Sequence, residues 1–299
     1  MSPVRSVSAR LTLLLFSLSL PALASAQSML PSIALIVDDV GNHLRRGTTA
    51  VDLPGDFTLA VLPHTAHAVR LAKLAHRAGK EVLVHLPMEP RSRANAGPGQ
   101  LTTQMGEGEF KDAVHRNLNA IPHAVGFNNH MGSRITASPL RMRWLMEAVN
   151  ERLEPLVAID SKTTPNSVLG ALAAEYNVEV AERDIFVDSR RTPEAIRQAL
   201  GALEAKAQRD GFALGIAHPY PETLHILRQW AHHLPERGIR LVNISRLIAG
   251  QRALELTATK PNVRSIAAKD DVSQDRDTDQ SWQPNQQRIS KQLGPAVKF

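Results

Sequence analysis

The chain has 299 residues and a mass of 32.7 kDa; 43% of its residues are apolar, 21% are charged, and none is cysteine. This composition excludes a collagen-like chain, a disulfide-stapled miniprotein and a wholly disordered protein. The formal charge is +6, but residues 27–250 carry 25 Lys and Arg against 23 Asp and Glu. Most of the excess charge therefore lies at the chain ends, and with no basic stripe we do not expect a nucleic-acid partner.

Residues 1–26 have the three parts of a secretory signal peptide. Arg5 and Arg10 precede an apolar run over 11–20, and small residues follow around Ala24 and Ala26. An uncleaved membrane anchor is the alternative, but the run is shorter than the roughly 20 apolar residues that a spanning helix needs. We expect a periplasmic or secreted protein that has no stable membrane anchor after cleavage.

Short apolar runs then alternate with longer segments of helical period. Strands are predicted over residues 33–39, 57–63, 81–87, 125–130, 156–160, 178–184, 213–219 and 240–245. Helices are predicted over residues 65–78, 107–120, 139–153, 165–176, 192–210 and 221–236. This alternation indicates an α/β domain over 27–250 with a parallel sheet, either open or closed into a barrel. The polar segment 251–299 is predicted to be a disordered tail.

Polar residues interrupt the predicted strands at their carboxyl ends, the edge where parallel sheets and barrels build their sites. They are Asp38, Asp39, His85, Asn129, His130, Asp160, Asp184 and His218. Packing would favour apolar residues at these positions, so we expect one shared site. The other histidines lie on predicted helices or loops and are interpreted as surface or packing residues, apart from His43, a candidate for the rim.

Asp38 and Asp39 cannot both point to one face of an ideal strand. A turn at the strand end would let both reach a cleft, one as a metal ligand and the other as an acid or base. The alternative is that one of them caps the following helix. His85 and His130 favour the site, because one aspartate and two histidines form a familiar ligand set for catalytic zinc or a similar divalent ion.

The chain also resembles the divergent polysaccharide deacetylase family over residues 31–249. The resemblance depends on the order and spacing of six segments: VDD, LVHLPMEP, NNHMGS, IDS, ERDIFVD and GIAHP. That family is a branch of the polysaccharide deacetylase superfamily, so the resemblance implies a distorted (β/α)₇ barrel. It implies that Asp38 is the catalytic base, Asp39 and His85 are metal ligands, His218 is the general acid, and Asp160 orients catalytic groups.

One position departs from the superfamily pattern. Glu89 stands where the second histidine of a His-x-x-x-His motif is expected. The resemblance therefore makes His130 the replacement ligand, and Glu89 either a fourth ligand or a supporting group. Arg183 and Asp184 are expected to support the site through ion pairs rather than to react. Three further residues are candidates to bind substrate or to satisfy turns: Asn128, Asn129 and Ser133.

These residues together predict an exported, metal-dependent carbohydrate deacetylase. Its partner would be an N- or O-acetylated glycan of the envelope or the extracellular space, and its cofactor a divalent metal, with zinc expected. The metal would activate water, Asp38 would take a proton, and His218 would give one to the leaving group. Two other classes stay open: a catalytically silent barrel that binds a glycan or a protein, suggested by Glu89, and a metal-dependent phosphoesterase.

Overall fold

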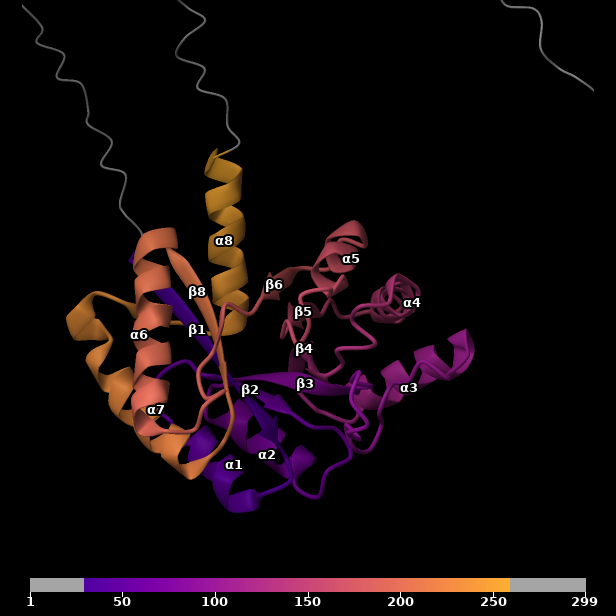
Figure 1. Cartoon of the computed structure of the whole chain (residues 1–299), viewed down its shortest axis with the longest axis horizontal. Helices are drawn as coiled ribbons and strands as arrows, with labels where there is room; N and C mark the ends of the chain where they lie inside the picture. Colours follow the sequence, from indigo (N-terminus) through magenta and orange to yellow (C-terminus); the bar gives the residue numbers. More distant parts are fainter. Residues whose placement is uncertain (1–29, 259–299) are drawn as a thin grey trace, which may run out of the picture. The chain divides into compact units, whose positions relative to one another are not determined.

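The computed structural model describes residues 30–258 and contains one curled, parallel, 9-stranded sheet (Figure 1). Its order is β6-β5-β4-β3-β2-β1-β8-β7, and β9 pairs with β1. The strands are β1 (Ser32–Val40), β2 (Thr58–Val61), β3 (Glu81–Met88), β4 (Ala124–Met131), β5 (Val157–Asp160), β6 (Val180–Glu182), β7 (Ile185–Phe186), β8 (Phe212–Ala217) and β9 (Arg240–Leu241). The predicted α/β fold of distorted-barrel type is confirmed.

The sheet stays open between β6 and β7, since no ladder joins these two strands in the described part of the chain. One strand was predicted over 178–184, but the chain changes partner there. The Arg183 amide donates to the Asp160 carbonyl on β5, whereas the Asp184 amide donates to the Leu214 carbonyl on β8. The segment 183–184 therefore crosses the opening and links the two ends of the sheet.

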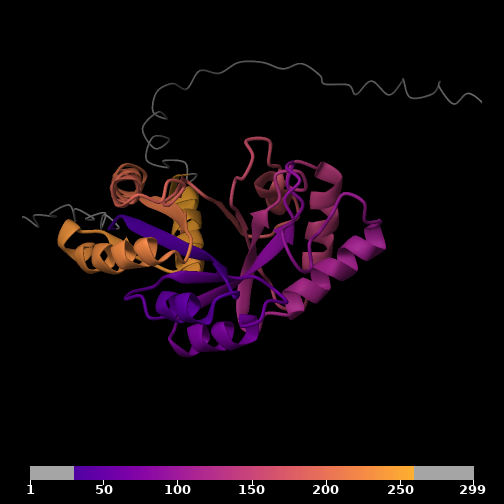
Figure 2. The same ribbon diagram turned by 60° about the horizontal axis from the view of Figure 1, so that its bottom comes forward.

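Helices between the strands cover the outer face of the sheet (Figures 1 and 2). They are α1 (Leu44–Val51), α2 (Ala68–Arg77), α3 (Glu107–Asn119), α4 (Pro139–Asn150), α5 (Leu169–Glu175), α6 (Pro193–Asp210) and α7 (Pro221–His233). Alternate strand residues such as Ile33, Leu35 and Val37 pack in the core beneath them. None of the helices in residues 30–258 combines the length and apolar character needed to cross a membrane.

The inner face of the sheet has a second core, which is closed by α8 (Ile244–Ala258). Ile36 and Leu83 on the inner face pack in one cluster with Ile244 and Leu247 of this helix. The Ile244 amide donates to Thr58 Oγ1 at the first residue of β2. The helix thus fills the inner face at the amino ends of the strands, so the carboxyl ends are left for a site.

Two of these helices, α1 and α8, were not predicted. In α1, Gly47 allows close packing, because a Cβ atom there would lie 2.4 Å from Leu71 Cδ1 of α2. The predicted strand over 240–245 is wrong beyond β9, since Asn243 Oδ1 accepts from the Arg246 amide and α8 begins at Ile244. The predicted boundary at residue 250 falls within α8. The signal peptide over 1–26 and the tail beyond 258 lie outside the described residues.

Candidate metal and catalytic site

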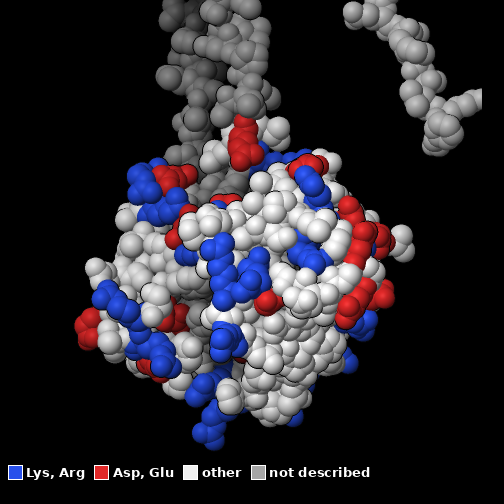
Figure 3. Space-filling view, turned by 45° about the vertical axis from the view of Figure 1, so that its right-hand side comes forward, with Lys and Arg blue, Asp and Glu red and all other residues white. Residues whose placement is uncertain are grey.

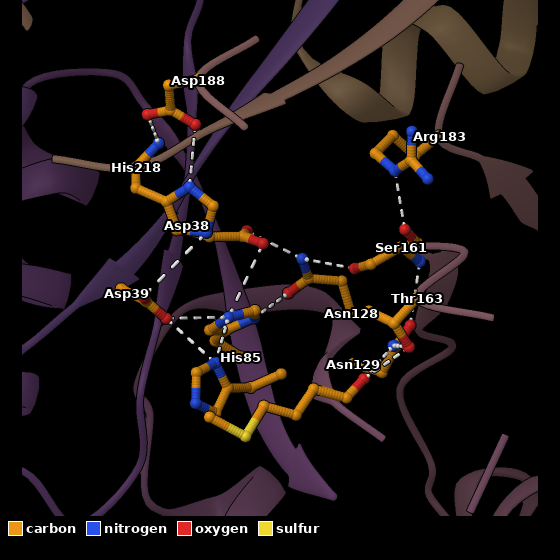
Figure 4. Close-up of polar contacts among 12 residues, drawn as sticks. Asp38, Asp39, His85, Asn128, Asn129, Ser161, Thr163, Arg183, Asp188 and His218 are labelled. Atoms are coloured by element: carbon orange, nitrogen blue, oxygen red, sulfur yellow. Dashed lines mark hydrogen bonds and ion pairs between the residues drawn. The ribbon is translucent and has the colours of Figure 1, made fainter. Parts of the chain in front are cut away.

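Side-chain alternation along β1 brings Asp38 into the curled sheet. Ala34 and Ile36 belong to the inner core, so Asp38 shares their face. Asp39 would point outward with Val37, but its φ of 56° turns the chain into the left-handed region. Both carboxylates consequently reach the same site (Figure 4). Neither acts as the helix cap that the sequence left open, because the residue before α1 is His43.

The register between β3 and β4 places His85 directly beside Asn128, and both share the inner face with Asp38. Asn128 Nδ2 donates to Asp38 Oδ1 at 2.8 Å, and its Oδ1 lies 2.8 Å from His85 Nδ1. All three side chains are buried, with exposed fractions of 2% or less. Asn128 therefore links the predicted base to a predicted metal ligand.

Three candidate metal ligands converge beside this link. Asp39 Oδ1 lies 3.2 Å from His85 Nε2 and 3.0 Å from His130 Nδ1, and the two histidine nitrogens are 3.0 Å apart. His130 reaches the group because it lies two residues beyond Asn128 on the same face of β4. One atom from each of the three residues lies within 4.8 Å of the others, as required for a shared ion.

The hydrogen bonds around His85 also suit a metal. The Asp38 carboxylate only accepts, so Asn128 turns its amide NH₂ toward Asp38 and its carbonyl toward His85. His85 Nδ1 must then carry a proton, which leaves a lone pair on Nε2 in the neutral ring. That lone pair points to Asp39 and His130. Fixing the tautomer of a ligating histidine in this way is common at metal sites, and we conclude that the donor set fits a divalent ion.

His218 approaches Asp39 from the other side, after β8. β8 pairs with β1 up to Val37 and Ala217, which places the following residues, Asp38 and His218, side by side. His218 Nε2 lies 4.0 Å from Asp39 Oδ2. Its Nδ1 lies 2.9 Å from Asp188 Oδ1, and Asp188 is 4% exposed. Asp188 thus orients the ring, as an acid or base residue requires.

The surroundings alter the acid strength of His218 and Asp38. Burial lowers the pKa of His218, but the hydrogen bond to Asp188 and the charges of Asp38 and Asp188 outweigh it and raise that pKa to about 9. Burial raises the pKa of Asp38 above its ordinary value, although the charges of His85 and His218 oppose this. His218 is thus protonated at neutral pH, and Asp38 is a stronger base than an exposed aspartate.

Glu89 lies away from the ligand cluster. Its Oε2 accepts from the amide and hydroxyl of Thr103, and its Oε1 pairs with Arg134 Nε at 3.0 Å. β3 remains extended through Met88, so Glu89 lies about 13 Å along the strand from His85. A residue four positions on would reach the same ion only from a helical turn. Of the two roles that the sequence left open for Glu89, these contacts favour the supporting one: it anchors the loops after β3 and β4.

Asp160, Arg183 and Asp184 also hold loops. Asp160 has the opposite alternation to Ile159 of the inner core, and its Oδ1 accepts from the Lys162 amide. It makes no hydrogen bond or ion pair with Asp38 or His218, so it does not orient them directly. Arg183 donates to the carbonyls of Ser161 and Lys162, and Asp184 Oδ2 accepts from the Leu214 amide.

Asn129 and Ser133 take the turn-stabilising alternative. Asn129 accepts from the Ser161 amide and donates to the Met131 carbonyl, which ties the end of β4 to the loop after β5. Ser133 Oγ accepts from the Arg91 amide. Neither residue lines the cavity described next. Asn128 lies at the centre of the hydrogen-bond network, but the sequence does not distinguish it from Asn129, because both are asparagines on the same strand.

A cavity of about 380 Å³ opens over the cluster. Asp39, His130 and His218 line it, and so does His43, which the sequence singled out as a candidate for the rim. The loop after β3 provides another wall through residues 95–98. Tyr220, which the sequence did not single out, lines the cavity with its ring 5.7 Å from that of His218.

A comparison with known protein families shows the family to which the chain belongs. The sequence pattern of the divergent polysaccharide deacetylases matches residues 35–248, which include every strand end that contributes to the cluster. The chain belongs to the divergent polysaccharide deacetylase family. The cluster of one aspartate and two histidines is therefore a candidate metal site within a family of carbohydrate deacetylases.

Proteins with similar sequences occur in bacteria. The uncharacterized protein YibQ of Escherichia coli K12 is 34% identical over 234 residues, which cover 78% of this chain and 70% of YibQ. An uncharacterized protein of Haemophilus influenzae is 33% identical over 222 residues, covering 74% of this chain and 78% of that protein. The crystal structure of the uncharacterized protein ATU2773 from Agrobacterium tumefaciens C58 matches with a TM-score of 0.70 and 26% identity, covering 74% and 91% of the two chains.

Proposed function

We propose that this protein is an exported, metal-dependent deacetylase that removes acetyl groups from a glycan of the bacterial envelope. The single observation that carries the proposal is the convergence of Asp39, His85 and His130 between the predicted base and the predicted acid. Family membership supports a glycan as the substrate class. The sequence of residues 1–26 supports export, which would restrict the enzyme to glycans outside the cytoplasm.

Asp39 Oδ1, His85 Nε2 and His130 Nδ1 are the atoms that would hold the ion. Two imidazoles and one carboxylate form a set typical of catalytic zinc, so we propose zinc. When bound, a divalent ion supplies Lewis-acid polarisation of the acetyl carbonyl and of the attacking water. The neighbouring His130 and His85 rings outweigh the effect of burial and hold the pKa of Asp39 well below its usual value, so Asp39 is ionised for this role.

Asp38 would act as the general base. The amide of Asn128 holds its Oδ1, while its Oδ2 lies 3.6 Å from His85 Nε2, next to the ligand cluster. A carboxylate in this position can accept a proton from water as the water attacks the acetyl carbon. Because the side chain is buried, little solvent competes for that proton.

His218 would act as the general acid on the opposite side. With a pKa of about 9, it holds its proton at neutral pH and can donate from Nε2 to the departing amine or alkoxide. Asp188 holds Nδ1 and compensates the positive charge of the ring. The products would be acetate and a glycan with a free amine or hydroxyl group.

The decisive test combines metal content with acetate release. After stripping and zinc reconstitution, we expect about one zinc per chain and acetate release from an acetylated oligosaccharide. His130→Ala should lose both, whereas His225→Ala, which changes an exposed histidine of α7, should lose neither. If wild-type protein that binds zinc releases no acetate from acetylated envelope glycans, the deacetylase assignment is wrong.

A silent binding barrel is the second candidate, because Glu89 replaces the usual histidine and is engaged with Thr103 and Arg134. This candidate predicts glycan binding without acetate release. Export is tested separately by fractionating cells that express the full chain and sequencing the mature amino terminus. A periplasmic protein that begins at Gln27 would support signal cleavage, whereas an intact, membrane-bound amino terminus would support the anchor.

A further inference from the structure

The cavity lining holds few acidic groups to pair with the arginines near it. Among the described lining residues, Asp39 is the only one with a carboxylate, and it belongs to the candidate metal site. Arg46 of α1 lines the same cavity. Arg191 is not itself a lining residue, but it lies 4.8 Å from the centre of the ring of Tyr220, which lines the cavity. One guanidinium group thus lines the cavity and a second lies against a lining ring, while no described lining residue besides Asp39 carries a carboxylate.

Neither the Arg46 nor the Arg191 side chain stabilises the fold through a polar contact. In residues 30–258 their side chains make no hydrogen bond or ion pair, and both residues are exposed. Other arginines are engaged: Arg134 pairs with Glu89, and Arg237 pairs with Glu204. Acidic and basic groups both appear on the molecular face in Figure 3, and ion pairs such as Lys111 with Glu107 join them elsewhere. Other exposed arginines, such as Arg45 and Arg143, also make no ion pair within residues 30–258, and Arg46 differs from them because it lines the cavity.

The ion proposed above would take up Asp39, the one carboxylate of the described cavity lining, and Asp188 is already engaged with His218. An acetylated neutral sugar brings no charge with it. A substrate that also carried an anionic group would supply the counter-charge that Arg46 and Arg191 lack, and guanidinium binds carboxylate and phosphate through paired hydrogen bonds.

We propose that the cavity selects acetylated glycans that carry an anionic group, a carboxylate or a phosphate, near the acetylated sugar. Arg46 is the specificity-determining residue, and Arg191 contributes from its place against the Tyr220 ring. This inference rests on the proposed deacetylase function and narrows its substrate class. It also agrees with the small number of aromatic side chains in the chain, 4% of residues, because charge would replace part of the usual stacking on sugar rings.

Three probes test the proposal on zinc-loaded protein. They are triacetylchitotriose as the neutral glycan, the disaccharide of N-acetylglucosamine and N-acetylmuramic acid as the carboxylate glycan, and a 6-phosphorylated N-acetylglucosamine oligosaccharide as the phosphate glycan. We expect the wild type to have a higher kcat/KM for at least one anionic probe than for the neutral one. Arg46→Gln should reduce that preference about tenfold through KM, since a charge-assisted pair is lost.

Arg45→Gln is the matched control, because Arg45 is the exposed neighbour on α1 and does not line the cavity. It should leave the preference unchanged. Arg46→Lys keeps the charge without the paired donors and should retain part of it. Whichever anionic probe is preferred identifies the source of the charge. Equal kcat/KM for all three probes, or a preference that Arg46→Gln leaves intact, would overturn the inference while the deacetylase function stands.

Failure of the proposed function has a different signature. If no probe releases acetate, the binding of the same probes is measured by calorimetry with the wild type, Arg46→Gln and Arg45→Gln. Tighter binding of an anionic probe that only Arg46→Gln weakens would support charge selection in a silent barrel. Equal affinity for the three probes, or no binding of any of them, would overturn charge selection as well.

Discussion

His85 Nδ1 donates to Asn128 Oδ1 over 2.8 Å, at a register position where β3 and β4 pair directly. The same asparagine donates to Asp38. One amide therefore determines the tautomer of a candidate metal ligand and orients the proposed base. The two proposed functions of the site, metal binding and proton transfer, thus depend on a shared residue that would perform neither.

Replacement of Asn128 should separate its two contributions. Asn128→Ala leaves His85 Nδ1 without an acceptor, and we expect zinc affinity to fall about 10- to 100-fold. Asn128→Asp restores an acceptor for Nδ1 but places a second carboxylate beside Asp38, so it should retain more affinity and lose activity. Competition with a chromophoric chelator measures the affinity. Equal zinc affinity in wild type and Asn128→Ala would contradict the assigned tautomer.

Replacing each of the two adjacent aspartates by asparagine should have different effects on zinc binding and activity. Asp38→Asn retains the cluster of Asp39 and the two histidines, so zinc binding should persist while kcat falls at least about 100-fold. Asp39→Asn removes a ligand, so zinc itself should be lost. Metal analysis and acetate release on the same preparations distinguish them. Full activity in Asp38→Asn would show that another group takes the proton.

Glu89 should matter to loop stability and not to metal content. Glu89→Gln keeps an acceptor for Thr103 but weakens the pair with Arg134, and we expect zinc stoichiometry to remain at wild-type level. The free energy of unfolding should fall by about 1 kcal/mol, the range for a partly exposed pair. Urea denaturation and metal analysis provide the two readouts. A loss of zinc in this variant would return Glu89 to the ligand set.

The pair of His218 and Asp188 should make stability depend on pH. The folded-state pKa of His218 is about 9, above its ordinary value of 6.5. The raised pKa contributes stability that is fully present below pH 6.5 and is lost as the pH rises through about 9, by up to about 3 kcal/mol.

Metal-free wild type and Asp188→Asn provide the measurement. Their difference in unfolding free energy, from urea titrations at pH 6 and pH 10, should shrink at the higher pH. The loss of hydrogen bonds from the His218 amide and Thr223 is common to both pH values and cancels. A difference that does not change with pH would show that His218 is neutral throughout.

Much of the fold could be predicted because parallel strands buried on both faces leave continuous apolar runs, as in β1 and β3. The helix α1 was not predicted because its sequence, LRRGTTAV, contains a glycine, which disfavours helix in isolation. The benefit of Gly47 is its close packing against Leu71, which only the structure reveals. The start of α8 was not predicted because its first turn continues an apolar segment, and only the Asn243 cap separates strand from helix.

The site was predictable where side-chain alternation and strand ends agree, as at His85 and His218, which the structure brings together around Asp39. The strand-end reasoning fails at Asp160. This residue also ends a strand, but its side chain alternates away from the inner face, and a shift of one residue along the strand determines which face a side chain takes. No strand-end rule distinguishes Asn128 from Asn129, whose roles depend on the register with β3 and on the loop after β5.

The left-handed backbone of Asp39 places stability and metal binding in opposition. With φ at 56°, the position suits glycine better than any residue with a Cβ atom. Asp39→Gly should therefore be about 1 kcal/mol more stable than Asp39→Ala in the metal-free state, although both lose the ligand. Glycine at position 39 would therefore give a more stable chain that lacks one of the three candidate ligands, so the aspartate is retained here at a cost in folding stability.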